Sequence, residues 1–400
     1  MLSINTLRNI HKKDFEKFFS TNKVKLRSKR IIPNAGEERY TPISRIIREE
    51  LHNQTSFTDL EMDEFLFNQL FYATNNWHYV YQNQDINQIF LSEDLDEVIS
   101  FIEEIEDLKY NNLLIAKLET NQYALCTTRL EIVDDKVKAI HFLFRLGNVK
   151  TDEGYHTFFS AVTVDVENNL VTFRFNQNLL DSFDEDPLTV ISMLKDILNG
   201  ENSNYPALEN LQLNIIGFNE EVPQRIISQL FKELSADAEN ILNQRVPENT
   251  ESDIREFLRS KGLPSQEDYI QQIKSVIYQD ISQTCADTLF TKGWVFRFVF
   301  REGRITRASS RTDDKSPIYG SKVYWHLKEL IFKSEEMREA GFHWYIDNPI
   351  DNEEPTFVQV RLEARNDSLI VHYYYKMQSP NRKEKEDYVL QKINGYFHNN

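Results

Sequence analysis

A run of period-two segments in the middle third limits the fold of this chain more than any other feature. Five segments there alternate apolar and polar side chains, as strands with one buried face do. They are Leu113–Leu118, Tyr123–Ile132, Val137–Arg145, Tyr155–Val166 and Leu170–Phe175. The connections between them are too short for the crossover helix that parallel neighbours need, so the pattern predicts an antiparallel meander.

The segments on either side of this meander carry mostly helical periodicity. Apolar residues recur at intervals of three and four over Ile4–Phe19, Asp59–Thr74 and Glu267–Leu289. We therefore expect an α+β protein of three domains. These are a mainly helical N-terminal domain (1–110), an antiparallel α+β domain with a central β-meander and flanking helices (111–245), and a C-terminal α+β domain (246–400).

The C-terminal domain is expected to hold an antiparallel sheet covered on one face by the helices predicted over Glu267–Leu289 and Tyr319–Glu339. In Trp294–Phe300, alternation predicts that Trp294, Phe296, Phe298 and Phe300 point toward those helices. Gly341 is expected to end a helix over Tyr319–Glu339. The residues expected on the uncovered face include Arg297, Arg301, Arg361, His372 and Tyr374.

The net charge of −17 is distributed unevenly along the 400 residues. Residues 1–50 contain 12 Lys and Arg against 6 Asp and Glu, whereas residues 51–110 contain 1 against 13. Residues 111–250 remain acidic, with 11 against 21, and residues 251–400 are nearly balanced, with 22 against 23. The acidity therefore lies in the middle of the chain, which leaves both ends open to anionic partners.

Several common chemistries lack their motifs in this sequence. The 11 glycines form neither a phosphate-binding loop nor a nucleophile elbow, and the nine histidines show no metal-binding spacing. Cys126 and Cys285 are too far apart for a zinc site and are expected to be core residues. We expect no cofactor and no metal. No apolar run is long enough to span a bilayer and no secretory signal is evident, so we expect a cytoplasmic protein without membrane contact.

Three weak catalytic patterns each have a simpler interpretation. Asp134–Lys136 and Asp313–Lys315 have the residue types of a nuclease metal site but lie in predicted turns. Arg338 and His343 have the loose spacing of some metal-independent ribonucleases, at a frequency that chance accounts for. His141 and Arg145 share one strand face, where a histidine satisfied by its neighbours is the simpler interpretation.

Two groups of basic residues are the candidate contacts with nucleic acid or a partner. The N-terminal group is Lys23, Lys25, Arg27, Lys29 and Arg30. The C-terminal group is Arg297, Arg301, Arg304, Arg307, Arg311, Arg361, His372 and Tyr374. Arginine and tyrosine suit both phosphate recognition and protein hot spots. For the N-terminal group, the alternatives are a solvated edge strand, a mobile arm near the terminus, or docking on the acidic segment 51–110. For the C-terminal group, the alternative is an ordinary antiparallel sheet with one solvated face.

The sequence therefore predicts a non-enzymatic interaction or regulatory protein, a subunit of a larger assembly that contacts a protein partner or nucleic acid. A bacterial antiviral-defence or mobile-element setting is expected, because the chain is poor in motifs, is predicted to have several domains, and has a composition that indicates an AT-rich coding sequence. One alternative is a nuclease or hydrolase with a degenerate site. The other is an acidic immunity or decoy protein that inhibits a basic effector by charge complementarity. Enzymatic activity and oligomeric state are left open by the residues.

Overall fold

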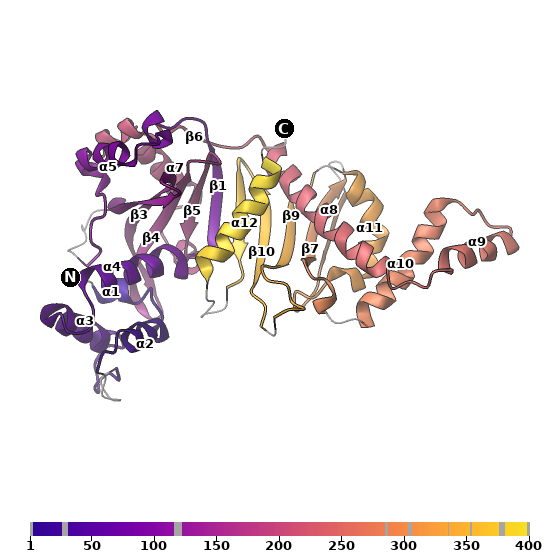
Figure 1. Ribbon diagram of the computed structural model, residues 1–400, viewed down its shortest axis with the longest axis horizontal. Helices are drawn as coiled ribbons and strands as arrows, with labels where there is room; N and C mark the ends of the chain where they lie inside the picture. The colour runs from indigo at the N-terminus through magenta and orange to yellow at the C-terminus, as the bar shows by residue number, and fades with distance from the viewer. Residues whose placement is uncertain are drawn as a thin grey trace. The chain divides into compact units, whose positions relative to one another are not determined.

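The chain has an α+β fold, described by a computed structural model (Figure 1). The structure describes residues 3–25, 31–115, 122–284, 287–302, 306–334, 336–352, 354–375 and 381–397. Its internal contacts divide the chain into two compact units, unit 1 (1–217) and unit 2 (218–400). The three-domain division with boundaries near residues 110 and 245 groups the segments differently and stays a prediction.

Unit 1 combines short helices with an antiparallel sheet. Its helices are α1 (Ile4–Leu7), α2 (Lys12–Thr21), α3 (Thr41–Asn53), α4 (Asp59–Asn68), η1 (Gln69–Ala73), η2 (Gln88–Leu91), α5 (Leu95–Glu104), η3 (Glu106–Leu108), α6 (Gln177–Leu180), α7 (Pro187–Leu198) and η4 (Pro206–Leu211). Its strands are β1 (Trp77–Asn83), β2 (Ala124–Val133), β3 (Lys136–Thr151), β4 (Gly154–Asp165), β5 (Leu170–Phe175) and β6 (Ile215–Ile216).

The strands of unit 1 follow the order β2-β3-β4-β5-β1, and β6 pairs with β1. Consecutive strands β2 to β5 pair antiparallel, which is the expected meander. The expected segment Leu113–Leu118 forms no strand at residues 113–115, and its remainder lies outside the described residues. Asn169, which turns the chain between β4 and β5, has a φ of +56°, a conformation that asparagine tolerates.

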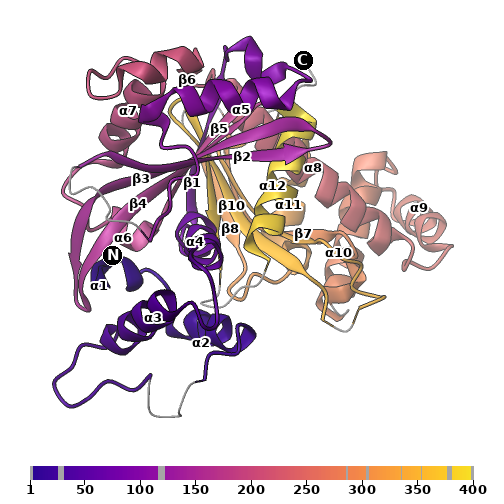
Figure 2. The same ribbon diagram turned by 60° about the vertical axis from the view of Figure 1, so that its left-hand side comes forward.

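Aromatic side chains from the N-terminal helices cover one face of this sheet. Phe15 and Phe19 of α2 and Leu66 of α4 are buried in one apolar cluster with Leu143 of β3 and Phe159 of β4. Figure 2 shows α1 to α4 on one side of β3 and β4, with α5 and α7 on the other. Burying apolar area on both faces stabilises the long strands β3 and β4, whose central residues are fully enclosed.

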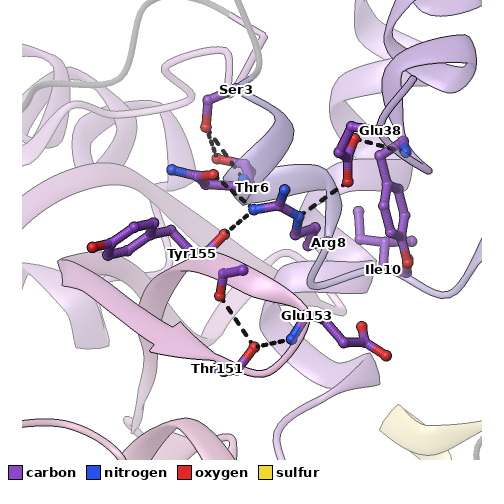
Figure 3. Close-up of polar contacts among 11 residues, drawn as sticks. Ser3, Thr6, Arg8, Ile10, Glu38, Thr151, Glu153 and Tyr155 are labelled. Atoms are coloured by element: carbon purple, nitrogen blue, oxygen red, sulfur yellow. Dashed lines mark hydrogen bonds and ion pairs between the residues drawn. The ribbon is translucent and has the colours of Figure 1, made fainter. Parts of the chain in front are cut away.

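Arg8 joins the N-terminal helices to the turn between β3 and β4 (Figure 3). Its Nη1 donates to the carbonyl oxygen of Tyr155 at 2.7 Å, and its Nε pairs with Glu38 Oε1 at 3.2 Å. The guanidinium occupies the space where a side chain at residue 154 would be, because a Cβ on Gly154 would lie 2.8 Å from Nη1. The helical periodicity over Ile4–Phe19 predicts one helix, but the structure has two, α1 and α2, and Arg8 is the C-cap residue at the end of α1.

Unit 2 has the same two kinds of element. Its helices are α8 (Glu221–Asn243), α9 (Thr250–Ser260), α10 (Glu267–Thr284), η5 (Asp287–Leu289), η6 (Ile318–Gly320), α11 (Lys322–Lys333) and α12 (Arg382–Phe397). Its strands are β7 (Gly293–Glu302), β8 (Thr306–Arg311), β9 (Glu339–Tyr345), β10 (Phe357–Arg365) and β11 (Ser368–Tyr373). Their order is β11-β10-β9-β7-β8, and the neighbours pair antiparallel.

One face of the sheet in unit 2 is covered by helices, as expected, although the main covering helix is a different one. Helix α8 packs on β7, β9 and β10, and Figure 1 shows it lying across these strands with α12 beside it. Its buried Ile227, Leu230, Phe231 and Leu234 form a helical stripe. The Phe231 ring meets Phe298 of β7 at 5.9 Å. The sequence-based expectation assigned this cover to the later helices because α8 was placed in the middle domain.

A β-bulge in β7 overturns the expected facing of Trp294 and Phe296. Val295 pairs with Phe342, but Arg297 pairs with Gly341, so Phe296 is an extra residue between them. Trp294 consequently pairs with a residue of the uncovered face, not the helix-covered one. Gly341 ends no helix: it lies inside β9, and a Cβ there would lie 2.5 Å from the Phe296 ring. A glycine within a strand marks such a close approach.

Replacement of Gly341 by alanine should destabilise unit 2. The added Cβ would force the Phe296 ring out of its position on β9, an overpacking that costs about 1–3 kcal/mol. Gly395→Ala is the matched control, because a Cβ on that helical glycine meets nothing within 4 Å. Urea unfolding followed by tryptophan fluorescence measures both. Equal midpoints for Gly341→Ala and the unmodified chain would contradict the tight contact.

Candidate functional site

The face of the unit 2 sheet opposite α8 carries a set of polar and aromatic side chains, which we call the polar face. The register places Arg361 opposite both Gly341 and His372, and Gln359 opposite His343. The bulge adds side chains of β7 to the same face. The polar face consists of Trp294, Phe296, Arg297, Arg311, His343, Gln359, Arg361, His372 and Tyr374.

Arginines of adjacent strands meet on this face. The register sets Arg311 of β8 directly opposite Arg297 of β7. Like charges at such positions repel, so the pair must be compensated. Arg297 forms an ion pair with Glu339, and Arg361 forms one with Glu363, in which Nη2 lies 3.7 Å from Oε2. Within the described part of the chain, Arg311 has no carboxylate within ion-pair distance, which leaves its charge available to an outside anion.

The segment after β8 brings a further cation to the polar face. Lys315 Nζ lies 4.5 Å from the centre of the Tyr374 ring, a cation–π distance. Trp294 Nε1 donates to the carbonyl oxygen of Lys315 at 2.7 Å, which fixes this segment over the sheet. Periodicity could not reveal Lys315, because it lies in a turn with a φ of +55°.

The pKa of Tyr374 reflects the charges around it. Burial raises this pKa above its usual value, while Arg361, Arg297 and Arg311 lower it and Glu339 raises it. The three guanidinium groups therefore lie close enough to act on one hydroxyl. Tyr374 itself is half-buried, and its ring touches His372 at a centroid distance of 4.5 Å. Together these groups make a positive site with an aromatic wall.

Three rings stack at the other end of the polar face. His343 lies parallel to Trp294, with centroids 3.8 Å apart, and parallel to Phe357, at 4.8 Å. Only 5% of His343 is exposed, and Gln359 bonds to its Nδ1 at 3.1 Å. Burial and the nearby Lys315 lower the pKa of His343 to about 3. The ring is therefore neutral at physiological pH and serves as a stacking surface.

His372 is also held neutral. Burial, Arg361 and Lys315 lower the pKa of this histidine to about 4. Neither histidine adds positive charge at neutral pH, so the positive potential of the polar face comes from arginine and lysine. An anion placed among these cations would oppose the repulsion that keeps His372 unprotonated.

The structure brings together part of the expected C-terminal group. Arg297, Arg311, Arg361, His372 and Tyr374 lie on the polar face. Arg307 is exposed on β8 and pairs in register with position 301, whose side chain is not described. Arg304 lies outside the described residues, as do Arg27, Lys29 and Arg30 of the N-terminal group. Lys23 and Lys25 are exposed after α2 in unit 1.

The weak catalytic patterns are not assembled into a site. Asp134 and Asp135 form the tight turn between β2 and β3, with φ values of +50° and +59°. Arg338 pairs with Glu220, whereas His343 is buried in its ring stack. No cluster of three or more histidine, cysteine or acidic side chains that could hold a metal occurs in the described ranges.

His141 is engaged by its neighbours within unit 1. Its Nδ1 lies 3.0 Å from Thr163 Oγ1 and its Nε2 lies 3.1 Å from Glu131 Oε2. Both ring nitrogens are thereby satisfied, and the ring packs edge-on against Phe71 at 5.0 Å. The geometry is that of a buried histidine fixed in the core.

Comparisons of the chain with protein-family models, curated proteins and solved structures find no match. Among the helices that the structure describes, none is long and apolar enough to cross a membrane. Functional inference therefore depends on the geometry of the sites themselves.

The stability of unit 2 should fall as the pH drops below about 6.5. The folded chain holds His343 neutral down to a pKa of about 3, whereas the unfolded chain protonates it near its ordinary value of 6.5. Between these values the unfolded state binds the extra proton, so this residue lowers the free energy of unfolding by about 1.4 kcal/mol per pH unit of acidification.

Urea unfolding at pH 7, 6 and 5 measures this dependence. His343→Asn should make the pH profile less steep, because asparagine does not titrate, and the slope that remains comes from His372, whose pKa is lowered to about 4. His326→Asn, at an exposed histidine of α11, is the matched control and should leave the profile unchanged. Parallel profiles for His343→Asn and the unmodified chain would show that the buried ring does not govern the loss of stability.

Proposed function

We propose that this chain is a non-enzymatic nucleic-acid-binding protein that contacts the phosphate backbone through the polar face of unit 2. The observation that carries the proposal is the cross-strand pair of Arg311 and Arg297, beside Lys315 and Arg361. Against these four cations, Glu339 and Glu363 are the carboxylates whose ion pairs on this face are described. The local charge is positive although the chain as a whole is acidic.

A phosphodiester backbone suits this arrangement. Guanidinium groups on adjacent strands present several donors to phosphate oxygens, and neutralising phosphates releases condensed counterions. Tyr374 and the exposed part of Phe357, which is 38% accessible, offer ring surface on which a base can stack. Protein hot spots use the same residue types, but the excess of positive charge favours a polyanion over a neutral protein surface.

The acidic unit 1 fits a role inside a larger assembly. A protein whose one part attracts polyanions and whose other part repels them would hold nucleic acid in a defined orientation. We extend the proposal to a cytoplasmic complex, in a bacterial defence or mobile-element setting, with unit 1 facing protein subunits. The ring stack around His343 and the turn at Asp134 supply no catalytic group to this role.

The double variant Arg307→Ala/Arg311→Ala should weaken nucleic-acid binding. Both side chains are exposed on β8, and the unbroken register from 307 to 311 puts them on the same side of the strand, so Arg307 continues the row of cations at the edge of the polar face. Fluorescence anisotropy with labelled single-stranded oligothymidine and oligouridine, from low to physiological salt, gives the affinity and its salt dependence. We expect about a tenfold loss of affinity at low salt, and a salt slope smaller by between one and two, because two phosphate contacts are removed.

The matched control is Arg259→Ala/Lys261→Ala, which removes the same charge from exposed positions at the end of α9. This control should retain the affinity and slope of the unmodified chain. Two results would refute the proposal: equal effects of both double variants, or no binding of either oligonucleotide by the unmodified chain at low salt.

A further inference from the structure

Unit 1 contains an open groove between α2 and α4 that has no part in the polar face. Its volume is about 750 Å³, and its lining comes from the end of α2, the outer side of α4, residues 111–113 and β2. The apolar part is formed by Phe18, Leu60, Phe65 and Leu113. Phe18 and Phe65 stack with centroids 4.4 Å apart and provide a flat wall.

Leu60 is an apolar residue of this wall whose side chain is exposed to solvent. It is 69% exposed on the outer side of α4, whereas Met62 and Leu66 of the same helix are fully buried in the core. Packing in the core of unit 1 therefore does not explain why position 60 carries a leucine. Two adjacent rows of the helix α4 line the groove: residues 60 and 64 form one row, and residues 61, 65 and 68 form the other. Leucine and phenylalanine side chains therefore alternate with glutamate side chains along the groove wall.

The charge of the groove is negative. Arg129 is its cation among the lining residues, and it donates to Asp63 Oδ2 at 2.5 Å and to Glu64 Oε2 at 2.6 Å. Glu61 contributes a third carboxylate, held at the start of α4 by a capping box with Thr58. One guanidinium against three carboxylates leaves an excess of about two negative charges beside an apolar wall.

We infer that this groove binds a cationic peptide segment of a protein partner. An apolar side chain of that segment would pack on Phe18, Leu60 and Phe65, while its lysine or arginine side chains meet Glu61 and Glu64. Nucleic acid is excluded as the occupant by the negative charge. The assignment is independent of the proposed function of unit 2, since different residues of a different unit carry it.

The mode of recognition follows from the two kinds of contact. Apolar anchors at helical spacing let an amphipathic segment lie in a groove, and acidic residues at its rim select positive over negative segments. Arg129 remains engaged by its two carboxylates and so fixes one side of the groove. The Glu64 side chain is 61% exposed, and its Oε1, which accepts from Asn68 Nδ2 at 2.8 Å, lies outside the ion pair with Arg129.

The test uses a fluorescein-labelled amphipathic peptide of leucine and lysine, with a leucine–glutamate peptide of the same pattern as its counterpart. Anisotropy titration with the full chain should show binding of the lysine peptide and at least tenfold weaker binding of the glutamate peptide. Glu64→Lys should weaken binding of the lysine peptide about tenfold, and Leu60→Ala about fivefold.

Matched controls lie elsewhere on unit 1. Glu104→Lys changes the same charge on α5, and Leu188→Ala truncates a leucine of α7 that is 44% exposed. Both should bind the lysine peptide as the unmodified chain does, and circular dichroism checks that every variant is folded. Equal losses in groove and control variants would overturn the inference, as would equal affinity for the two peptides.

Two further measurements distinguish a peptide-binding groove from a contact between two copies of the chain and from an effect on the polar face. Sedimentation of the unmodified chain and of Glu64→Lys should show that no dimer forms through this groove. Such a dimer would assign the groove to a second copy and overturn the partner assignment. Oligonucleotide binding should be unchanged in Leu60→Ala, so that failure of the groove and failure of the polar face are distinguished.

Discussion

The extra residue Phe296 in β7 determines which side chains the polar face of unit 2 displays. Without it, strict alternation would place Trp294 beneath α8, away from His343. The bulge shifts the pleat by one residue, so that Trp294 and Arg297 share a face with the ring of Phe296 between them. This shift depends on Gly341, because no other residue leaves room for that ring. The aromatic stack and the row of cations therefore share one structural origin.

Burial and charge on the polar face act together on its two histidines. His343 and His372 are surrounded by rings and lie near Lys315, so protonation is opposed both by desolvation and by repulsion. At neutral pH the positive charge of the polar face therefore comes from its arginine and lysine side chains alone. Unit 1 carries the opposite sign in its groove, where Arg129 is outnumbered by carboxylates. Under the two proposals above, the polar face of unit 2 binds a polyanion and the groove of unit 1 binds a cationic segment, so the two units select different partners by charge.

Much of the architecture could be predicted from the local alternation of apolar and polar residues along the sequence. Period-two segments predicted the meander of β2 to β5, and alternation within β10 and β11 put Arg361, His372 and Tyr374 on one face. The bulge could not be predicted, because an extra residue leaves the alternation of apolar and polar side chains unchanged in the sequence. It nevertheless moves the side chains on one side of the bulge to the opposite face of the sheet. The turn residue Lys315 was missed for a related reason: its position depends on a hydrogen bond from Trp294, which is a tertiary contact. The break before α2 lies beside another tertiary contact, the hydrogen bond from Arg8 to the β3–β4 hairpin.

That reach of Arg8 has a consequence for which changes the β3–β4 hairpin tolerates. The guanidinium bonds to the main-chain oxygen of Tyr155, whose own side chain is 53% exposed. Any side chain at position 155 would preserve the bond, since every residue supplies the same carbonyl. Position 154 has the opposite character, with a φ of +114° and the guanidinium where a Cβ would lie. In this hairpin, a residue whose side chain does not affect the bond to Arg8 stands next to a glycine whose backbone conformation other residues rarely adopt. The bond itself uses a main-chain oxygen, which substitutions on the hairpin cannot remove.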